Sequence, residues 1–273
     1  MSCERVLKDI QAWQLQYSAY EPNDFEMIYD DWIKESFRAI NPGVKAKFFS
    51  KIDNWLFHSH AFLQGTAYQK EARLRLLNTG SIFNTNIEKI EDMKTLSIDQ
   101  LTYIAEQQVA KGKLYAFAQG GITGSGGLLL LGIDFPLMLI MNLRVVQLIG
   151  LSFGHEMNRP FEMMLSLKLF HAATLPKRLQ AAAWEGLVRE IEQQSHAYIY
   201  EGAEEITDES WLDQPLKQAI KSMFILMFRR KIFQSLPIIS MGIGAVFNYQ
   251  LTRQVTEFSL RFYQYRYILE KGE

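Results

Sequence analysis

Residues 114–154 decide the fold of this chain, and they read LYAFAQGGITGSGGLLLLGIDFPLMLIMNLRVVQLIGLSFG. Between residues 114 and 153 the only charged residues are Asp134 and Arg144. Six glycines crowd the first half, at positions 120, 121, 124, 126, 127 and 132. In a lone helix these glycines would cost roughly 6 kcal/mol relative to alanine, so close packing against another element must offset them.

The spacing of the glycines predicts how this packing arises. Gly120, Gly124 and Gly127 recur at the i, i+4 and i+7 positions of one helical face, which lets a second backbone come close. A helix broken at Gly126-Gly127 is the other interpretation of the same residues.

Asp134-Phe135-Pro136 predicts the turn of a helical hairpin with arms 114–133 and 135–153. A proline disfavours helix at the residue before it and suits the first turn of a new helix. Asp134 could then cap the second helix by accepting backbone hydrogen bonds. Arg144 lies in an apolar context, where a buried charge needs a partner, and Asp134 is one candidate.

Apolar residues recur at helical spacing over most of the chain, and no alternating run typical of a strand appears. A second patch of small residues, Gly242 and Gly244, predicts another close helix contact. The fold is predicted to be all-α, a multi-helix bundle around the glycine-rich hairpin, in one domain of residues 1–273 with a sub-boundary near residue 112. The other predicted helices are 4–20, 22–40, 45–63, 66–78, 84–93, 98–110, one starting at Pro160, 176–200 and 246–269.

No catalytic or cofactor motif is complete. The glycines lack the lysine of a P-loop, the third glycine of a dinucleotide fingerprint and the first glycine of a nucleophile elbow. Ser125, Asp134 and His155 follow the order of a hydrolase triad, but about 30 residues are too few for that fold. The alternative that stays open is a hydrolase or small-ligand pocket around the Asp134 turn, lined by Asp134, Asn142, Arg144, His155 and His171.

Metal and nucleic-acid sites are not predicted. The densest set of metal-ligating residue types lacks the H-E-x-x-H spacing of a zinc site. The formal net charge of −1 provides no overall field that would attract nucleic acid. The set consists of His155, Glu156, Glu162, His171 and Glu185.

A cytoplasmic location is expected. The single cysteine, Cys3, suits a reducing compartment, and Glu4 and Asp9 do not fit a signal peptide. Leu114–Ile133 and Ile232–Thr252 carry no charge over 20 and 21 residues, so an integral protein with hairpin spans is an alternative. The mean hydropathy of −0.09 favours buried core helices instead.

Arg229, Arg230 and Lys231 form a basic cluster between Phe228 and Ile232. Basic residues beside large apolar ones suit the surface of an anionic membrane. Peripheral contact with such a membrane, or with a membrane protein, is therefore expected, although an exposed helix turn is the other interpretation.

The ordered set of motifs over nearly the whole chain resembles the EcsC protein family, in the version from low-GC Gram-positive bacteria. The resemblance implies a gene beside an ABC transporter, with links to secretion and competence. It implies no catalytic residues. The motifs are Trp13, Trp55, Gln64-Gly65, Ile98-Asp99-Gln100-Leu101, Gly120-Gly121-Ile122-Thr123-Gly124, Ile133-Asp134-Phe135-Pro136, Asn142-Leu143-Arg144, Gln147, Phe153-Gly154, Pro237, Gly242-Ile243-Gly244-Ala245, Asn248-Tyr249, Thr252-Arg253, Tyr263 and Arg266.

Overall fold

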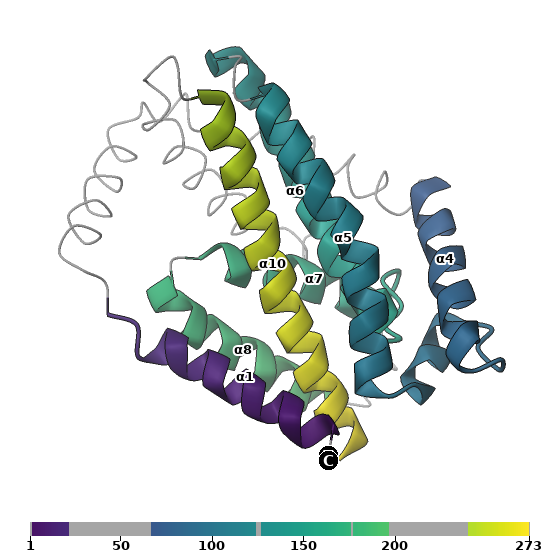
Figure 1. The fold of residues 1–273 in the computed structure, drawn as a ribbon. Helices are drawn as coiled ribbons and strands as arrows, with labels where there is room; N and C mark the ends of the chain where they lie inside the picture. The colour runs from purple at the N-terminus through teal and green to yellow at the C-terminus, as the bar shows by residue number, and fades with distance from the viewer. Residues whose placement is uncertain (1, 22–66, 124–126, 176, 197–239, 273) are drawn as a thin grey trace, which may run out of the picture.

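The computed structural model describes residues 2–21, 67–123, 127–175, 177–196 and 240–272 (Figure 1). Within these ranges, side chains are left undescribed at residues 67–69, 111–123, 127–137, 160, 178, 193–196 and 240–247. The described residues form helices and turns, with no strand among them. The predicted all-α fold is therefore confirmed.

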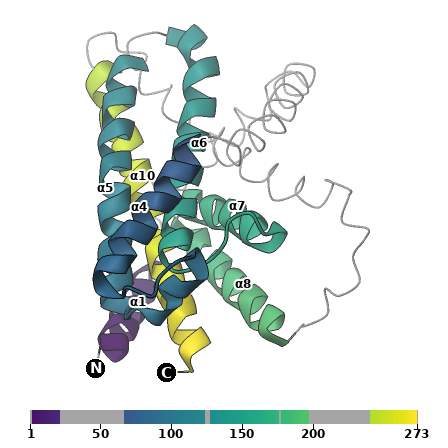
Figure 2. The same ribbon diagram turned by 90° about the vertical axis from the view of Figure 1, so that its right-hand side faces the viewer.

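Three long helices form the centre of the molecule: α5 (Ile98–Thr123), α6 (Gly127–Ser152) and α10 (Ser240–Lys271). α5 runs antiparallel to both α6 and α10. The end of α5 and the beginnings of α6 and α10 therefore lie at the same end of the bundle (Figures 1 and 2). Apolar side chains from all three helices are buried in the core, among them Leu101, Ile104, Leu139, Val146, Val255 and Phe258.

Shorter helices pack around this centre. α1 (Ser2–Ser18) and α8 (Lys177–His196) lie side by side across α10 (Figure 1). α7 (Pro160–Thr174) packs against α6, α8 and α10, whereas α4 (Ala67–Phe83) packs against α5 and α6, and the 3-10 helix η1 (Ile90–Thr95) packs against α4 and α6. Aromatic rings join the layers, because Trp13 lies 5.1 Å from Trp184 and 5.5 Å from Phe258 between ring centroids.

Local sequence signals explain several helix ends. The backbone N–H of Ser97 donates to Gln100 Oε1 at 2.9 Å, and the N–H of Gln100 donates to Ser97 Oγ at 3.4 Å. This capping box makes Ser97 the cap of α5, which begins at residue 98 as predicted. Pro160 occupies the first turn of α7, as predicted. α6 ends at Ser152, and Gly154 follows it with a φ of 83°, which is readily adopted only by a residue without a Cβ.

The turn of the central hairpin is not where Asp134-Phe135-Pro136 predicted it. α5 continues to Thr123 and α6 begins at Gly127, so the break lies among the glycines, as the alternative interpretation predicted. Asp134 and Pro136 lie inside α6, and Asp134 therefore caps no helix. A proline inside a helix costs about 3 kcal/mol, so the packing of α6 against α5 and α10 outweighs this local preference.

Gly80 was also misread by sequence reasoning. Asn78-Thr79-Gly80 predicts the end of a helix, but α4 continues to Phe83. A Cβ on Gly80 would lie 2.5 Å from Met93 Sδ and 3.2 Å from Ile87 Cδ1. The glycine is therefore explained by the close approach of η1 to α4, and not by a helix end.

Other predicted bounds differ in length. α5 joins the predicted helix 98–110 to the first arm of the hairpin, and α10 begins at Ser240 instead of 246. The predicted helix 84–93 is replaced by the later 3-10 helix η1. The predictions for 22–40 and 45–63 lie outside the described residues. The single domain with a sub-boundary near residue 112, which falls within α5, stays a prediction.

Candidate functional site

The most strongly organised polar site is a buried group of charged side chains, called here the ionic cluster. It lies where the residues after α6 meet η1, the beginning of α7 and the end of α10. At its centre, Arg266 donates two hydrogen bonds to Glu162, from Nη1 to Oε2 at 2.8 Å and from Nη2 to Oε1 at 2.7 Å. The cluster consists of Lys94, His155, Glu162, Arg266 and Glu270.

The Glu162–Arg266 pair is almost completely buried, with 6% and 8% of the two residues exposed. Burial raises the pKa of Glu162, but hydrogen bonding to His155 and Arg266 outweighs this effect and lowers the pKa to about 2. Glu162 is therefore ionised at neutral pH. In this bidentate geometry, both carboxylate oxygens of Glu162 accept a hydrogen bond from Arg266. Such hydrogen bonds are needed to offset the cost of removing the two charges from water.

His155 bridges the two carboxylates of the cluster. Its Nδ1 lies 3.5 Å from Glu162 Oε1, and its Nε2 lies 3.9 Å from Glu270 Oε1. Burial lowers the pKa of His155 below its ordinary value, although Glu162 opposes this shift. Glu270 in turn accepts hydrogen bonds from Arg266 Nε at 2.9 Å and Lys94 Nζ at 2.7 Å.

Tyr263 and two glycines shape the wall of the cluster. Tyr263 is fully buried, and its ring centroid lies 5.4 Å from that of His155. A Cβ on Gly150 would lie 2.8 Å from the Tyr263 hydroxyl, so α6 can approach Tyr263 only through a glycine. At Gly154 a Cβ would lie 2.6 Å from Lys94 Cγ. These contacts give a physical reason for the Phe153-Gly154 and Tyr263 motifs.

Two further ion pairs hold the segment between α6 and α7. Arg73 of α4 donates to both carboxylate oxygens of Glu156 at 2.6 Å, and 8% of Glu156 is exposed. Arg159 Nη2 donates to Glu91 Oε1 at 2.8 Å, but this pair is more exposed. The segment is therefore fixed from α4, η1 and α10 at once.

The chemistry available to the ionic cluster is limited. A general acid or base must reach a substrate and titrate near the working pH. Both oxygens of Glu162 are bound by Arg266, and both ring nitrogens of His155 face carboxylates. The arrangement fits a role in joining helices. No group of three His, Cys, Asp or Glu that could hold a metal ion occurs among the described residues.

The residues of the predicted pocket do not share one place. His155 belongs to the ionic cluster, and the rise of α6 puts it roughly 27 Å or more from Asp134. Asn142 is buried and donates from Nδ2 to the Met138 carbonyl of its own helix at 2.7 Å. His171 is half-buried in the last turn of α7, and burial lowers its pKa. The side chain of Asp134 lies outside the described residues.

The proposed pairing of Asp134 with Arg144 does not fit the helix. The two residues lie ten positions apart on α6, which corresponds to about 15 Å along its axis. That separation exceeds the reach of a direct ion pair. Of the predicted metal-ligating types, His155 and Glu162 meet in the ionic cluster, Glu156 pairs with Arg73, and Glu185 is exposed on α8.

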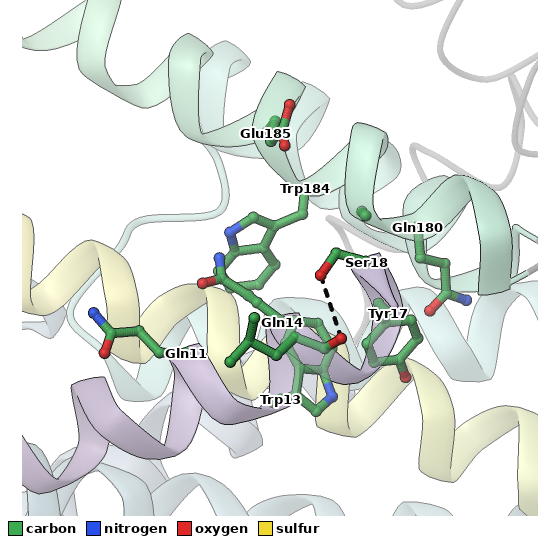
Figure 3. A pocket seen from close by; sticks show the side chains of 10 residues that line it. Gln11, Trp13, Gln14, Tyr17, Ser18, Gln180, Trp184 and Glu185 are labelled. Atoms are coloured by element: carbon green, nitrogen blue, oxygen red, sulfur yellow. Dashed lines mark hydrogen bonds between the residues drawn. The ribbon is translucent and has the colours of Figure 1, made fainter. Parts of the chain in front are cut away.

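A cavity of about 420 Å³ lies between α1 and α8 (Figure 3). Its wall is mainly aromatic and amide in character, and Trp184 and Gln14 project toward each other across it. Gln180 Nε2 donates to the carbonyls of Ala173 and Leu175, so its amide secures the turn between α7 and α8. The lining residues are Gln11, Trp13, Gln14, Leu15, Tyr17, Ser18, Gln180, Ala181, Trp184 and Glu185.

At the opposite end of the bundle, the described ends of α5, α6 and α10 contain no charged residue type, and this part is called here the uncharged end. It consists of Leu114–Thr123 of α5, Gly127–Ile133 of α6 and Ser240–Thr252 of α10, none of which contains Asp, Glu, Lys, Arg or His. The helix ends meet there (Figures 1 and 2), whereas the ionic cluster and both described chain ends lie at the other end. Charged residues are thus distributed unevenly along the long axis of the described bundle.

The predicted packing glycines fall at this uncharged end. Gly120 lies in the last turn of α5, Gly127 begins α6, and Gly242 and Gly244 lie in the first turns of α10. Gly124 lies outside the described residues, as do the membrane-surface candidates Arg229, Arg230 and Lys231. The roles proposed for all these residues stay predictions.

Within the helices whose side chains are described, no stretch is long and apolar enough to cross a membrane. The two candidate spans from the sequence, Leu114–Ile133 and Ile232–Thr252, lie wholly or mostly beyond those side chains.

Sequence reasoning had singled out the members of the central pair separately, Glu162 as a potential ligand and Arg266 as part of a motif. It could not pair them, because 104 positions separate the two residues. The α1–α8 cavity was missed, although Trp13 had been noted as part of a motif. A tryptophan on a helical face is ordinarily a core residue, and Trp13 is indeed only 6% exposed.

Comparisons with known proteins agree with the motif pattern. The EcsC protein family matches residues 4–268. The uncharacterized protein YdbA of Bacillus subtilis (strain 168) is 25% identical over 188 residues, which cover 67% of this chain and 64% of YdbA. The matched region thus spans less than two thirds of that protein, and no solved structure gives a significant match. Because the family match extends over nearly the whole sequence, the chain belongs to the EcsC protein family.

Proposed function

We propose that this EcsC protein is a non-enzymatic protein of the cytoplasmic membrane face, and that its uncharged end enters the lipid. The observation that carries the proposal is the charge distribution along the bundle. Three helix ends without a charged residue type meet at one end, while the ionic cluster lies at the other. A surface that enters lipid must exclude charges, because each costs about 3 kcal/mol in the apolar region.

The length of the uncharged end supports entry into one leaflet. Its three helix segments measure roughly 10 to 20 Å at a rise of 1.5 Å per residue. The hydrocarbon core of a bilayer is about 30 Å thick. The segments therefore match half of a bilayer better than a complete crossing.

The protein is proposed to be non-enzymatic because the buried ionisable groups of the ionic cluster and its surroundings are held in ion pairs. Glu162, Glu156 and Glu270 are each bound by a cation, and His155 lies between two carboxylates. A catalytic acid or base needs an accessible position and a pKa near the working pH. An ABC transporter, which the resemblance to the EcsC family suggests, is the candidate protein partner in this proposal.

Vesicle flotation tests the proposal with a matched pair of substitutions. Ile122 lies in the last turn of α5 at the uncharged end, whereas Ile82 of α4 is 78% exposed and lies outside it. We expect wild type and Ile82→Asp to float with phospholipid vesicles, and Ile122→Asp to bind roughly a hundredfold more weakly. Wild-type protein that stays with the soluble fraction, or equal flotation of both variants, would remove the proposal. Circular dichroism of each variant verifies the fold.

A further inference from the structure

The helix register fixes which charges first follow the uncharged end. Gln264 of α10 donates from Nε2 to Thr102 Oγ1 of α5 at 2.9 Å, which sets the two antiparallel helices level at this point. Lys113 lies eleven residues after Thr102, and Arg253 lies eleven residues before Gln264. Because both helices rise by the same distance per residue, Lys113 and Arg253 lie at the same height. Arg253 is exposed.

Other charges occupy the same height or the turn next to it. Lys111 precedes Lys113 on α5 by two residues. On α6, counting from its start at Gly127, Asp134 lies within one helical turn of this level. Three bases and one acid therefore give this zone a formal net charge of +2. The three bases of the zone, Lys111, Lys113 and Arg253, are called here the basic belt.

The next charges along the bundle are mixed in sign. On the side away from the uncharged end, Glu106 of α5 and Glu257 of α10 follow the basic belt, and by the same counting Arg144 of α6 and Arg261 of α10 lie near Glu106. Among the described helices, the order along the axis is thus no charge, then a zone of net positive charge, then charges of both signs and the ionic cluster. Anionic lipid headgroups lie directly outside the hydrocarbon region, where a basic zone below an apolar end would meet them.

We infer that the basic belt binds the phosphates of anionic phospholipid headgroups while the uncharged end lies in the acyl chains. The inference rests on the proposed function and adds a lipid class to it. Each basic residue near an anionic surface contributes about 1 kcal/mol of attraction. Loss of all three should therefore weaken binding roughly a hundredfold.

The test measures partition of full-length protein onto two kinds of vesicle, phosphatidylcholine alone and phosphatidylcholine mixed with phosphatidylglycerol. The belt variant carries Lys111→Gln, Lys113→Gln and Arg253→Gln. The control carries Lys8→Gln, Lys89→Gln and Lys271→Gln, three exposed bases in α1, directly before η1 and at the end of α10, and has the same net charge. We expect the belt variant to lose roughly a hundredfold on the mixed vesicles, and the control to lose far less.

The two vesicle types separate this inference from the proposed function. Wild type that binds both vesicles equally would overturn the basic belt while leaving membrane entry intact, and so would equal losses in the two triple variants. Wild type that binds neither vesicle overturns both. If the triple belt variant does not fold, the exposed Arg253→Gln alone should weaken binding to the mixed vesicles about fivefold, and no change would count against the belt.

Discussion

At the scale of single residues, the described part of the protein is held by charges that are buried in pairs. A buried ion pair contributes little net stability compared with an apolar substitute, but removal of one partner leaves an uncompensated charge. Without Glu162, Arg266 would keep only the more exposed Glu270 as a charged partner, although only 8% of Arg266 is exposed. The exposed Arg159–Glu91 pair is the natural contrast.

We predict that Glu162→Gln lowers the free energy of unfolding by about 3 kcal/mol, because Arg266 loses its buried, bidentate charged partner. Glu91→Gln should lower it by less than about 1 kcal/mol, because exposed pairs are screened by solvent. Urea denaturation at neutral pH measures both values. A similar small effect for the two variants would contradict the importance assigned to the buried pair.

The pH dependence of the same variant follows from the pKa of Glu162, which is about 2 instead of its ordinary 4.5. A carboxyl group with a lowered folded-state pKa contributes its stability fully above about pH 4.5 and loses it as the pH falls toward 2. The difference in stability between wild type and Glu162→Gln should therefore narrow across this window. A difference that stays constant from pH 6 to pH 2.5 would show that ionisation of Glu162 is not its source.

At the scale of elements, the sequence predicted helices well and their ends unevenly. Signals that act within one turn were reliable, since Ser97 caps α5 and Pro160 begins α7. Glycine and proline were misleading where packing between helices decides. Gly80 gives room to Met93 inside α4, and Pro136 lies within α6. These contacts depend on distant residues, and a local reading of the sequence contains no information about them.

The candidate site shows the same limit. The glycines, the charge-free stretches and Arg266 could all be found by reading along the chain. The pairing of Arg266 with Glu162 and the meeting of three helix ends could not, because both depend on how distant segments pack. His155 does not lie near Asp134, as the predicted pocket required, because α6 continues as one helix from Asp134 to Ser152.

Two helical glycines, one in α6 and one in α8, should respond oppositely to alanine. At Gly150 of α6 a Cβ would lie 2.8 Å from the hydroxyl and 2.9 Å from Cζ of the fully buried Tyr263, so Gly150→Ala should destabilise the protein by about 1–3 kcal/mol. At Gly186 of α8 a Cβ would meet nothing within 4 Å, so Gly186→Ala should stabilise it by up to about 1 kcal/mol. Thermal unfolding compares them, and stabilisation by Gly150→Ala would contradict the close contact.

At the scale of the whole molecule, charge is sorted along the axis of the bundle. Among the described helices, the uncharged end, the basic belt and the ionic cluster follow one another from one end to the other. This order matches the layers that a protein meets on entering an anionic membrane from the cytoplasm, which are acyl chains, headgroups and water. The proposed orientation places the ionic cluster and Cys3 away from the lipid.

The most direct test is an environment-sensitive dye placed at each end of the protein. The native Cys3, near the start of α1, labels the far end, and a Cys3→Ser, Ile122→Cys variant labels the uncharged end. On anionic vesicles, the dye at position 122 should shift to shorter wavelength and become protected from aqueous iodide, whereas the dye at Cys3 should stay accessible. Equal iodide access at the two positions on vesicle-bound protein would contradict insertion of the uncharged end.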